Sequence, residues 1–247
     1  MRCAGKIYVM LIMMGMLILG SQTFAQETTG TPNTLDPQEK AIISISSRAA
    51  KGDLVKLRQE LIIGLESGLT INQIKEVLVH LYAYCGFPRS IRAIQTFMDV
   101  LNDRKEKGIQ DTIGAEASPV TDTTSKYVRG KNVLGELSGV PQDGPLTGYN
   151  AFAPAIDTFL KEHLFADIFE RDVLTYQQRE LTTIAVLATI GDTEPMLRAH
   201  YGLCLNVGIT PEELKDFIVT IKPKAGPKKS GAAETVLNDV LKNRQEK

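Results

Sequence analysis

Gly68-Leu69-Thr70-Ile71-Asn72-Gln73, at positions 68–73, decides the fold, because the same pattern returns at positions 208–213 as Gly208-Ile209-Thr210-Pro211-Glu212-Glu213. In both stretches a glycine suits the left-handed residue that ends one helix. The threonine, with a Gln or Glu three residues later, forms a capping box that starts the next helix. Each stretch therefore predicts two helices that meet at a tight corner.

The similarity between the two stretches extends over much of the chain, at an offset of 139 positions in the first helix of each copy and of 140 positions beyond it. A polar residue found in only one copy of a repeated unit is not needed by the fold alone, so the comparison of the copies identifies candidate functional residues. Matching residues include Leu57 and Leu197, Lys75 and Lys215, Gly86 and Gly226, Ser90 and Ser230, and Asp99-Val100-Leu101 and Asp239-Val240-Leu241.

Further signals favour an all-α fold. Asp36-Pro37, and Thr175 with Gln178 three residues later, predict the first helix of each copy. Residues Ser125 to Leu137 predict a short helix that links the copies, and no stretch shows the alternating pattern of a β-strand. Apolar residues at helical spacing are expected to form the core: Ile74, Val77, Leu78 and Leu81 in the first copy, and Leu214, Phe217, Ile218 and Ile221 in the second.

The first residues predict export. A basic start is followed by an apolar run, Ile7 to Leu19, that is too short to span a bilayer, and then by small residues suited to cleavage after Ala25. We expect a signal peptide at 1–25, a first repeat at 26–107, a linker with a short helix at 108–150 and a second repeat at 151–247. The mature protein is expected to be periplasmic or secreted and free of the membrane; an uncleaved N-terminal anchor is the alternative.

The charge and cysteine content exclude some classes of protein. The formal net charge is −1, which gives no electrostatic reason to expect binding to nucleic acid. Outside the predicted signal peptide only Cys85 and Cys204 remain, too few for a disulfide scaffold. Cys204 is most simply a small buried residue, and a disulfide between Cys85 and Cys204 is an alternative.

Taken together, the copies resemble the carboxymuconolactone decarboxylase family, whose helical fold is shared with the alkylhydroperoxidase AhpD. In the first copy the resemblance lies in Gly68-Leu69-Thr70 and in His80-Leu81-Tyr82-Ala83-Tyr84-Cys85-Gly86-Phe87-Pro88. In the second it lies in residues 162–169, 179–185 and 197–210. The resemblance implies an AhpD-like fold of two tandem repeats, a ring-like homo-oligomer and a site that works without an organic cofactor.

This chain matches the redox-active, AhpD-like proteins only in part. AhpD-like proteins use a Cys-x-x-Cys pair with a Glu and a His nearby. Aligned on Glu180, those cysteine positions fall around Asp192 and Pro195. Dithiol chemistry is therefore not expected here.

Glu180 and His200 are the first candidate catalytic pair, because the first copy has Ala41 and Glu60 at the corresponding positions. A Glu on an otherwise apolar helix face, opposite a His on the next helix, would form a partly desolvated acid and base pair. The alternative is a surface or capping Glu and a His with ordinary structural partners.

His80, Tyr84 and Cys85 form the second candidate group, since the second copy has Thr220, Lys224 and Ala225 instead. His80 and Tyr84 fall on one face of a helix, where they could bind a substrate or each other. A helix end and a neighbouring imidazole would favour the Cys85 thiolate; structural roles for all three residues are the alternative. Because the copies have lost complementary groups, we expect one composite pocket.

Three further features of the sequence give weaker predictions. His163 lies one helical turn from Asp167, so it is a secondary substrate-binding candidate, with a surface contact as the alternative. A metal site built from His163, Glu180 and His200 lacks the close ligand spacing of a zinc helix, and no metal is expected. The basic run at 222–229 is expected to interrupt the helix as a solvated loop, or to attract an anionic substrate.

These residues and the family resemblance lead to the expected function. We expect a cofactor-independent lyase or proton-transfer enzyme that acts on a small carboxylated lactone or cyclic acid. His200 would donate the proton, Glu180 would orient it or act as the base, and His80 with Tyr84 would supply hydrogen-bond donors to an oxyanion. The alternatives are peroxide reduction through Cys85 and a non-catalytic, oligomeric binding protein of the envelope.

Overall fold

Every regular element of the described chain is a helix. The computed structural model describes residues 34–245, and in this range no strand is found, which confirms the all-α prediction. The expected signal peptide at 1–25 lies outside these residues. None of the helices between residues 34 and 245 is both long and apolar enough to cross a membrane.

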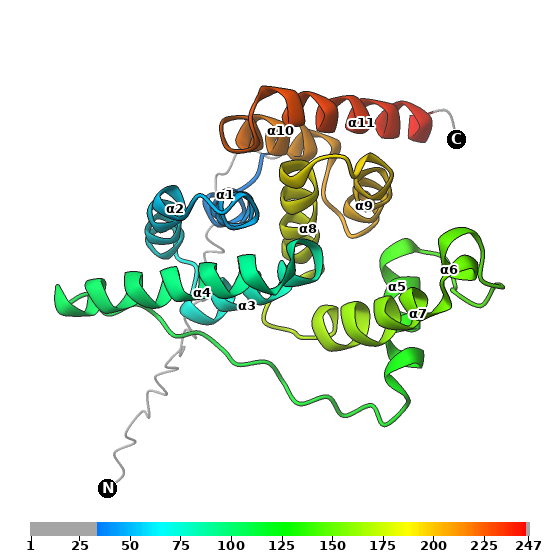
Figure 1. The fold of residues 1–247 in the computed structure, drawn as a ribbon, viewed down its shortest axis with the longest axis horizontal. Coiled ribbons are helices and arrows are strands. Elements are labelled where there is room, and N and C mark those ends of the chain that lie inside the picture. The colour runs from blue at the N-terminus through cyan, green and yellow to red at the C-terminus, as the bar shows by residue number, and fades with distance from the viewer. Residues whose placement is uncertain (1–33, 246–247) are drawn as a thin grey trace, which may run out of the picture. The chain divides into compact units, whose positions relative to one another are not determined.

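Two sets of four helices follow one another along the chain (Figure 1). In the second set, α9 and α10 begin 140 positions after α2 and α3, as the sequence repeat predicts. The first set is α1 (Pro37–Lys51), α2 (Leu54–Glu66), α3 (Ile71–His80) and α4 (Tyr82–Glu106); the second is α8 (Tyr176–Ile190), α9 (Glu194–Asn206), α10 (Pro211–Ala225) and α11 (Pro227–Gln245).

The predicted helix starts and corners are confirmed. Thr70, Thr175 and Thr210 each accept a hydrogen bond from the backbone N–H three residues later, and the side chain of that later residue accepts one from the threonine N–H. Gly68 and Gly208 have φ values of 93° and 98°. A left-handed backbone costs least for glycine, so these two residues allow the tight corners.

Each set also contains a kink at the same place. Gly86 bends α4 after its first turn with φ 80° and ψ 161°, and Gly226 separates α10 from α11 with φ 95° and ψ 162°. The structure corrects one expectation here, because α10 continues through Pro223 instead of ending in a loop. Burial of Ile221 and Ala225 in the core offsets the local preference of proline against a helix interior.

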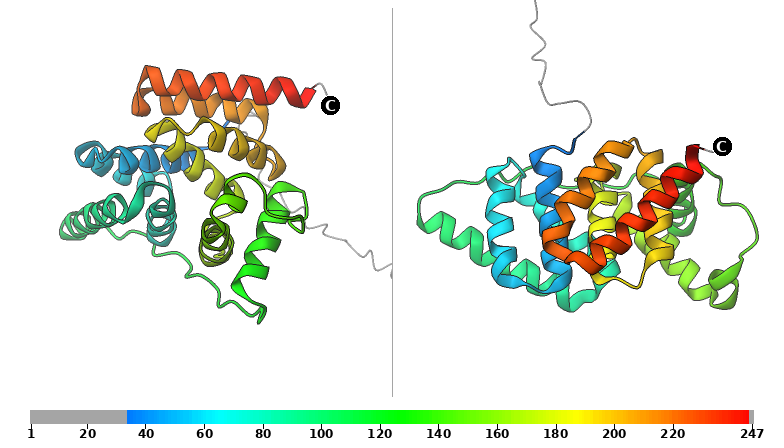
Figure 2. Two further views of the ribbon diagram at one scale, coloured as in Figure 1. Left: turned by 45° about the vertical axis from the view of Figure 1, so that its right-hand side comes forward. Right: turned by 90° about the horizontal axis from the view of Figure 1, so that it is seen from above.

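The core is built around α1 and α8, which pack against each other and are buried on most of their circumference. Thr189 Oγ1 of α8 donates a hydrogen bond of 2.8 Å to Ser47 Oγ of α1. Such all-round burial is typical of the central helices of a helical domain. In Figure 2, α11 lies along α10 and α9 on one side of this centre. The apolar residues predicted for α3 and α10 are all buried.

A segment between the two sets supplies one wall of the site described below. It comprises α5 (Lys126–Ser138), α6 (Gly148–Phe152), α7 (Pro154–Phe159) and η1 (Leu160–Phe169), a π-helical continuation of α7. The predicted linking helix is therefore confirmed as α5, and the expected linker boundary at residue 150 falls within α6. At Gly130 of α5 a Cβ atom would lie 1.7 Å from the carbonyl oxygen of Lys161, so α5 and η1 approach backbone to backbone.

Candidate active site

Glu180 and His200 meet in the structure. Glu180 lies on α8 and is fully buried, and its Oε2 is 2.8 Å from Nδ1 of His200 on α9. This contact directs the Nδ1 proton of His200 to the carboxylate and leaves Nε2 for a ligand. The other carboxylate oxygen, Oε1, is buried and has no hydrogen-bond partner. Leaving such an atom unpaired costs about 1–3 kcal/mol, and Glu180 itself is not among the residues that line the cavity described below.

Tyr84 approaches this pair from α4. Its ring lies edge-on to His200 with the ring centroids 6.0 Å apart, and its hydroxyl is buried beside the Thr183 side chain. Burial first, and the nearby Glu180 carboxylate second, raise the pKa of the Tyr84 hydroxyl, since both disfavour the phenolate. Tyr84 therefore keeps its proton and can donate it in a hydrogen bond to an oxygen of a bound molecule.

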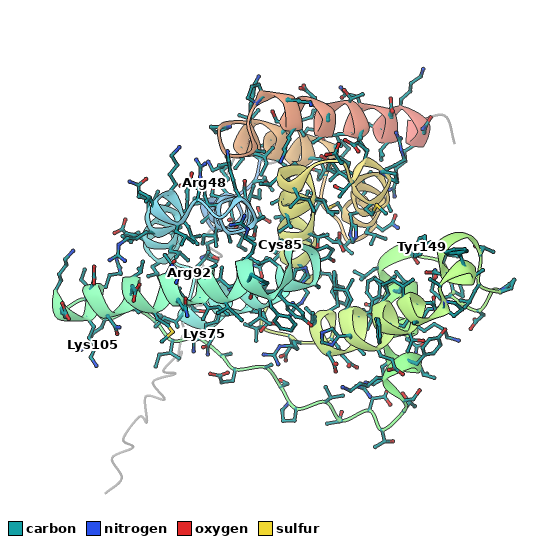
Figure 3. All side chains as sticks on the ribbon, viewed as in Figure 1. Arg48, Lys75, Cys85, Arg92, Lys105 and Tyr149 are labelled. Carbon is teal, nitrogen blue, oxygen red and sulfur yellow. The ribbon has the colours of Figure 1, made fainter. Side chains whose placement is uncertain are left out.

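Tyr84 and His200 line a cavity of about 910 Å³. Its walls come from α5, η1, α8 and α9 and from the segment at 138–150. Tyr149, labelled in Figure 3 on the part of the chain that holds α6, belongs to that segment. Much of the lining is apolar and includes Leu134, Leu160, Leu164, Phe165, Leu187 and Leu203. Cavities of this size and character are typical of small-molecule sites.

His80 is buried behind Tyr84 and does not line the cavity. Its Nδ1 is 3.3 Å from Nη1 of Arg179, and its Nε2 is 2.9 Å from Thr183 Oγ1. Because arginine only donates, Nδ1 carries no proton and the neutral ring donates from Nε2 to Thr183. Burial and the Arg179 charge hold the pKa of His80 well below its usual value. His80 therefore supports the stacked Tyr84 ring, 5.5 Å away, and its position differs from that expected of a donor to a substrate.

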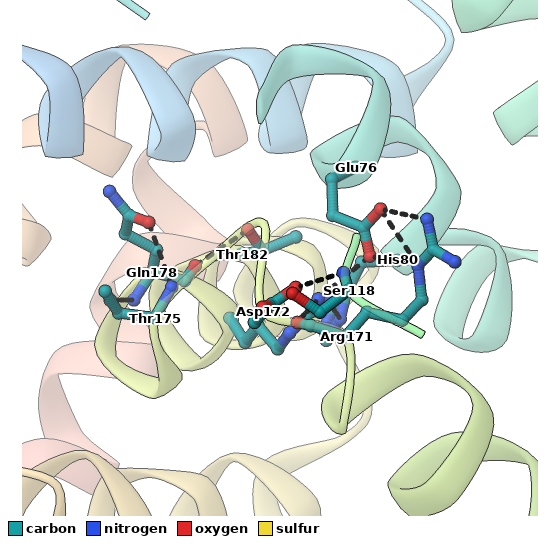
Figure 4. A network of polar contacts seen from close by, with 9 residues as sticks. Glu76, His80, Ser118, Arg171, Asp172, Thr175, Gln178 and Thr182 are labelled. Atoms are coloured by element: carbon teal, nitrogen blue, oxygen red, sulfur yellow. Dashed lines mark hydrogen bonds and ion pairs between the residues drawn. The ribbon is translucent and has the colours of Figure 1, made fainter. Parts of the chain in front are cut away.

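An ion-pair network holds Arg179 in place. Glu76 Oε1 is 2.8 Å from Arg179 Nη2 and 2.9 Å from Arg171 Nε, and Figure 4 shows Arg171 reaching Glu76. Glu76 and Arg179 are both buried, so each charge needs the other as a partner. Burial also lowers the pKa of Arg179, and Glu76 opposes this shift. The network fixes the ring orientation of His80.

Sequence reasoning missed Glu76, Arg179 and their network. Comparison of the copies could not find them, because the first and second copies have Lys40 and Asp216 at the equivalent positions, and these also form an ion pair, at 2.9 Å. One feature of the sequence could have identified Glu76: it is an acidic residue among the apolar residues on the buried face of α3.

Neither cysteine lines the cavity. Cys85, labelled in Figure 3, is half-buried, and its thiol donates to the Leu81 carbonyl oxygen at 3.2 Å. Burial raises the pKa of the Cys85 thiol to about 11, which is the reverse of the expected stabilised thiolate. Cys204 is fully buried on α9, as expected for a small apolar residue. Both thiols are free, so the alternative of a disulfide between them is not realised.

His163 is not brought to the cavity either. It lies on η1 with its side chain half exposed, and its Nδ1 is 3.0 Å from Asp167 Oδ2. Its ring also contacts Tyr82, with centroids 5.5 Å apart. In the described part of the chain, no three His, Cys, Asp or Glu side chains are grouped so that they could hold a metal ion. The structure thus unites Glu180, His200 and Tyr84, places His80 behind them, and leaves His163 and Cys85 outside.

Comparison with known proteins bears on both the repeat and the site. Residues 21–97 and 154–238 match the model of the carboxymuconolactone decarboxylase family, once in each copy. A 4-carboxymuconolactone decarboxylase from Acinetobacter baylyi is 32% identical over 119 residues, which are 48% of this chain and 88% of that protein. That relative therefore corresponds in length to about half of this chain, in agreement with a tandem repeat.

Proposed function

Because the chain belongs to the carboxymuconolactone decarboxylase family, we propose that it catalyses cofactor-independent lyase or proton-transfer chemistry on a cyclic carbonyl compound. A carboxylated lactone or cyclic acid is the first class to test. One observation carries the proposal: Tyr84 and His200 line a largely apolar cavity, and the fully buried Glu180, which is not part of that lining, lies 2.8 Å from Nδ1 of His200. The expected export and homo-oligomer are part of the proposal and rest on residues 1–25 and on the family.

His200 is the proposed acid and base. Its Nε2 exchanges a proton with a carbon of the substrate, and the Glu180 carboxylate at Nδ1 stabilises the imidazolium. Tyr84 donates a hydrogen bond to the carbonyl oxygen while negative charge develops there. In a decarboxylation, the electron pair of the breaking C–C bond moves toward that oxygen as CO₂ leaves. The resulting enolate then takes its proton at carbon from His200.

The two alternatives differ in their support. Peroxide reduction through Cys85 has no support from its position, since the thiol lies outside the cavity and its pKa is raised to about 11. A binding protein without catalysis would use the same cavity, so a test of the proposal must separate binding from turnover.

Replacing Glu180 separates binding from turnover. We expect Glu180→Gln to lower kcat by about 10²- to 10⁴-fold, because the carboxylate that orients His200 and stabilises its imidazolium is lost, with a smaller change in KM. Turnover of carboxylated lactones in D₂O, followed by NMR, measures both the rate and deuterium delivery to carbon.

The matched control is Glu60→Gln, the equivalent position in the first copy, which should leave kcat unchanged. Full activity in Glu180→Gln contradicts the proposed site. Binding of lactones by the unaltered protein without any turnover would assign the cavity to a binding protein instead.

A further inference from the structure

We propose that the substrate carries a large, uncharged apolar substituent, such as an alkyl chain, in addition to the small ring that reacts. The inference rests on the proposed function for the identity of the reacting ring. It goes beyond that function by assigning the class of the remainder of the molecule from the cavity.

The size of the cavity is the first argument. A volume of about 910 Å³ lies near the upper end of the roughly 300–1,000 Å³ that enclose drug-sized ligands. A lactone ring with one or two carboxyl groups is much smaller than such a ligand. If it were the whole substrate, most of the cavity would stay filled with water during the reaction.

The lining is the second argument. Away from Tyr84 and His200, the walls present aliphatic and aromatic side chains from α5, η1, α8 and α9, among them Leu134, Leu164, Phe165, Leu187, Met196 and Leu203. Such surface gains from contact with apolar atoms and gains nothing from water. An alkyl or aryl substituent would cover it.

The charge of the lining is the third argument. Lys161 is the one Lys or Arg among the lining residues of this cavity, and its Nζ lies 2.7 Å and 2.9 Å from the two Asp157 carboxylate oxygens and 3.0 Å from Tyr127 Oη. These acceptors match the three protons of the ammonium group. The side chains of Lys161 and Asp157 are both buried, so the pair is neutral and satisfied.

The remaining titratable groups add no positive charge. His200 is in contact with the Glu180 carboxylate, which balances the imidazolium when it forms. A carboxylate on the distant part of a ligand would therefore lose its hydration without gaining a cationic partner, which is strongly unfavourable. An uncharged substituent avoids this loss.

The segment at 138–150 gives a fourth argument. Val140, Leu146 and Tyr149 line the cavity and yet are 59%, 39% and 60% exposed. Exposed apolar groups that border one cavity are typical of a ligand-binding rim. A substituent that reaches them from the Tyr84 and His200 end would cover both this rim and the cavity walls.

Calorimetric titration with two sets of lactones tests the inference. The neutral set is γ-valerolactone, γ-octalactone and γ-dodecalactone, and the charged set is the same ring with a short carboxylated substituent. We expect the affinity of the neutral set to rise about fourfold per added CH₂, from about 0.8 kcal/mol for each buried CH₂, until the cavity is full. The carboxylated ring should bind more weakly than γ-octalactone.

Met196→Lys should reverse this preference for uncharged ligands, because it adds a positive charge to the cavity. Met196 is 51% exposed and lines the cavity, so a lysine there should fold normally and add a free cation. The variant should tighten binding of the carboxylated ring about tenfold and weaken binding of γ-dodecalactone. Val219→Lys on α10, 69% exposed and away from the cavity, is the matched control and should change neither affinity.

The outcomes separate this inference from the proposed function. Affinity that is independent of chain length, or tighter binding of the carboxylated ring by the unaltered protein, overturns the inference even if that ring is turned over. Chain-length-dependent binding without turnover of any long-chain cyclic compound keeps the inference and overturns the proposed function.

Discussion

His80 illustrates, at the scale of single residues, how partners decide the role of a side chain. The residue type suggests an acid or base, yet Arg179 faces one ring nitrogen and Thr183 the other. Because Arg179 can only donate, the ring is fixed in one neutral tautomer. Its stacking on Tyr84 then makes His80 a positioning residue for the Tyr84 side chain, which lines the cavity.

The neutral state of His80 predicts a loss of stability in mild acid. The pKa of a His in the unfolded chain is about 6.5, whereas the pKa of His80 in the fold is held well below this. As the pH falls below about 6.5, the unfolded state binds the proton and the folded state does not. Stability that is complete above pH 6.5 is therefore lost at up to about 1.4 kcal/mol per pH unit, until the folded pKa is reached.

Urea unfolding at pH 7, 6 and 5 measures this effect. His80→Gln should lack that part of the pH dependence, although it will be less stable at pH 7 because the buried contacts change. His163→Gln removes an exposed imidazole instead, and the part of the pH dependence that comes from His80 should remain in that variant. Equal pH dependence in the His80 variant would show that His80 titrates normally in the fold.

Among the elements, α5 and η1 together form one wall of the cavity, so the cavity depends on how they pack. They pack closely because Gly130 offers no side chain to the Lys161 carbonyl oxygen. The same pair of elements places Val133, Leu137, Leu164 and Phe165 in one apolar cluster. Lys161 is in turn tied to Tyr127 of α5 by a hydrogen bond, so backbone and side-chain contacts act together.

Two glycine substitutions on α5 should therefore have opposite effects on the stability of the fold. In Gly130→Ala the new Cβ would meet the backbone oxygen of Lys161 at 1.7 Å, and separating the two elements should cost about 1–3 kcal/mol or more. In Gly135→Ala the nearest atom is 3.5 Å away, and the higher helix propensity of alanine should stabilise by up to about 1 kcal/mol. Thermal unfolding followed by circular dichroism compares them; a shift of the same sign in both would refute the close approach.

At the scale of the whole molecule, the two copies have kept the ion pairs of the fold and divided the site. Arg179 of the second copy pairs with Glu76 of the first, and the equivalent residues, Lys40 of the first copy and Asp216 of the second, also form an ion pair. The positions equivalent to Tyr84 and His200 are Lys224 of the second copy and Glu60 of the first, whose charged atoms are 4.0 Å apart. Two oppositely charged side chains thus occupy the place that corresponds to Tyr84 and His200 at the cavity.

The glycine kinks allow this asymmetry to be measured. Gly86→Ala and Gly226→Ala each place a Cβ on a backbone with φ of 80° or 95°, with no atom closer than 3.6 Å at Gly86 and none within 4 Å at Gly226. Both should therefore lose a similar stability from backbone strain, about 1–3 kcal/mol. Only Gly86→Ala should also weaken binding of γ-octalactone, because Gly86 ends the helical turn that carries Tyr84. Denaturation and calorimetric titration of both variants check this; equal loss of binding would mean that the halves are equivalent in function.

The sequence alone determined the helices, their corners and the repeat, because these depend on local chemistry. A capping threonine such as Thr70 or Thr210, a glycine with positive φ and an apolar period act within a few residues, so each can be read from its neighbours. The contrast between copies also selected Glu180, His200 and Tyr84 as candidates, since each is replaced by a different residue type in the other copy, and the structure brings these three side chains together.

Only the tertiary structure decided what these groups do. The neutral state of His80 depends on Arg179 and Thr183, which are 99 and 103 positions away in the chain. The raised pKa of Cys85 depends on burial, and the Lys161 ammonium group is satisfied in part by Tyr127, which is 34 positions away. The ion pair of Glu76 with Arg179 joins residues 103 positions apart. Electrostatic effects act through space and strengthen as water is excluded, so they follow from the packing of helices and not from the order of residues along one of them.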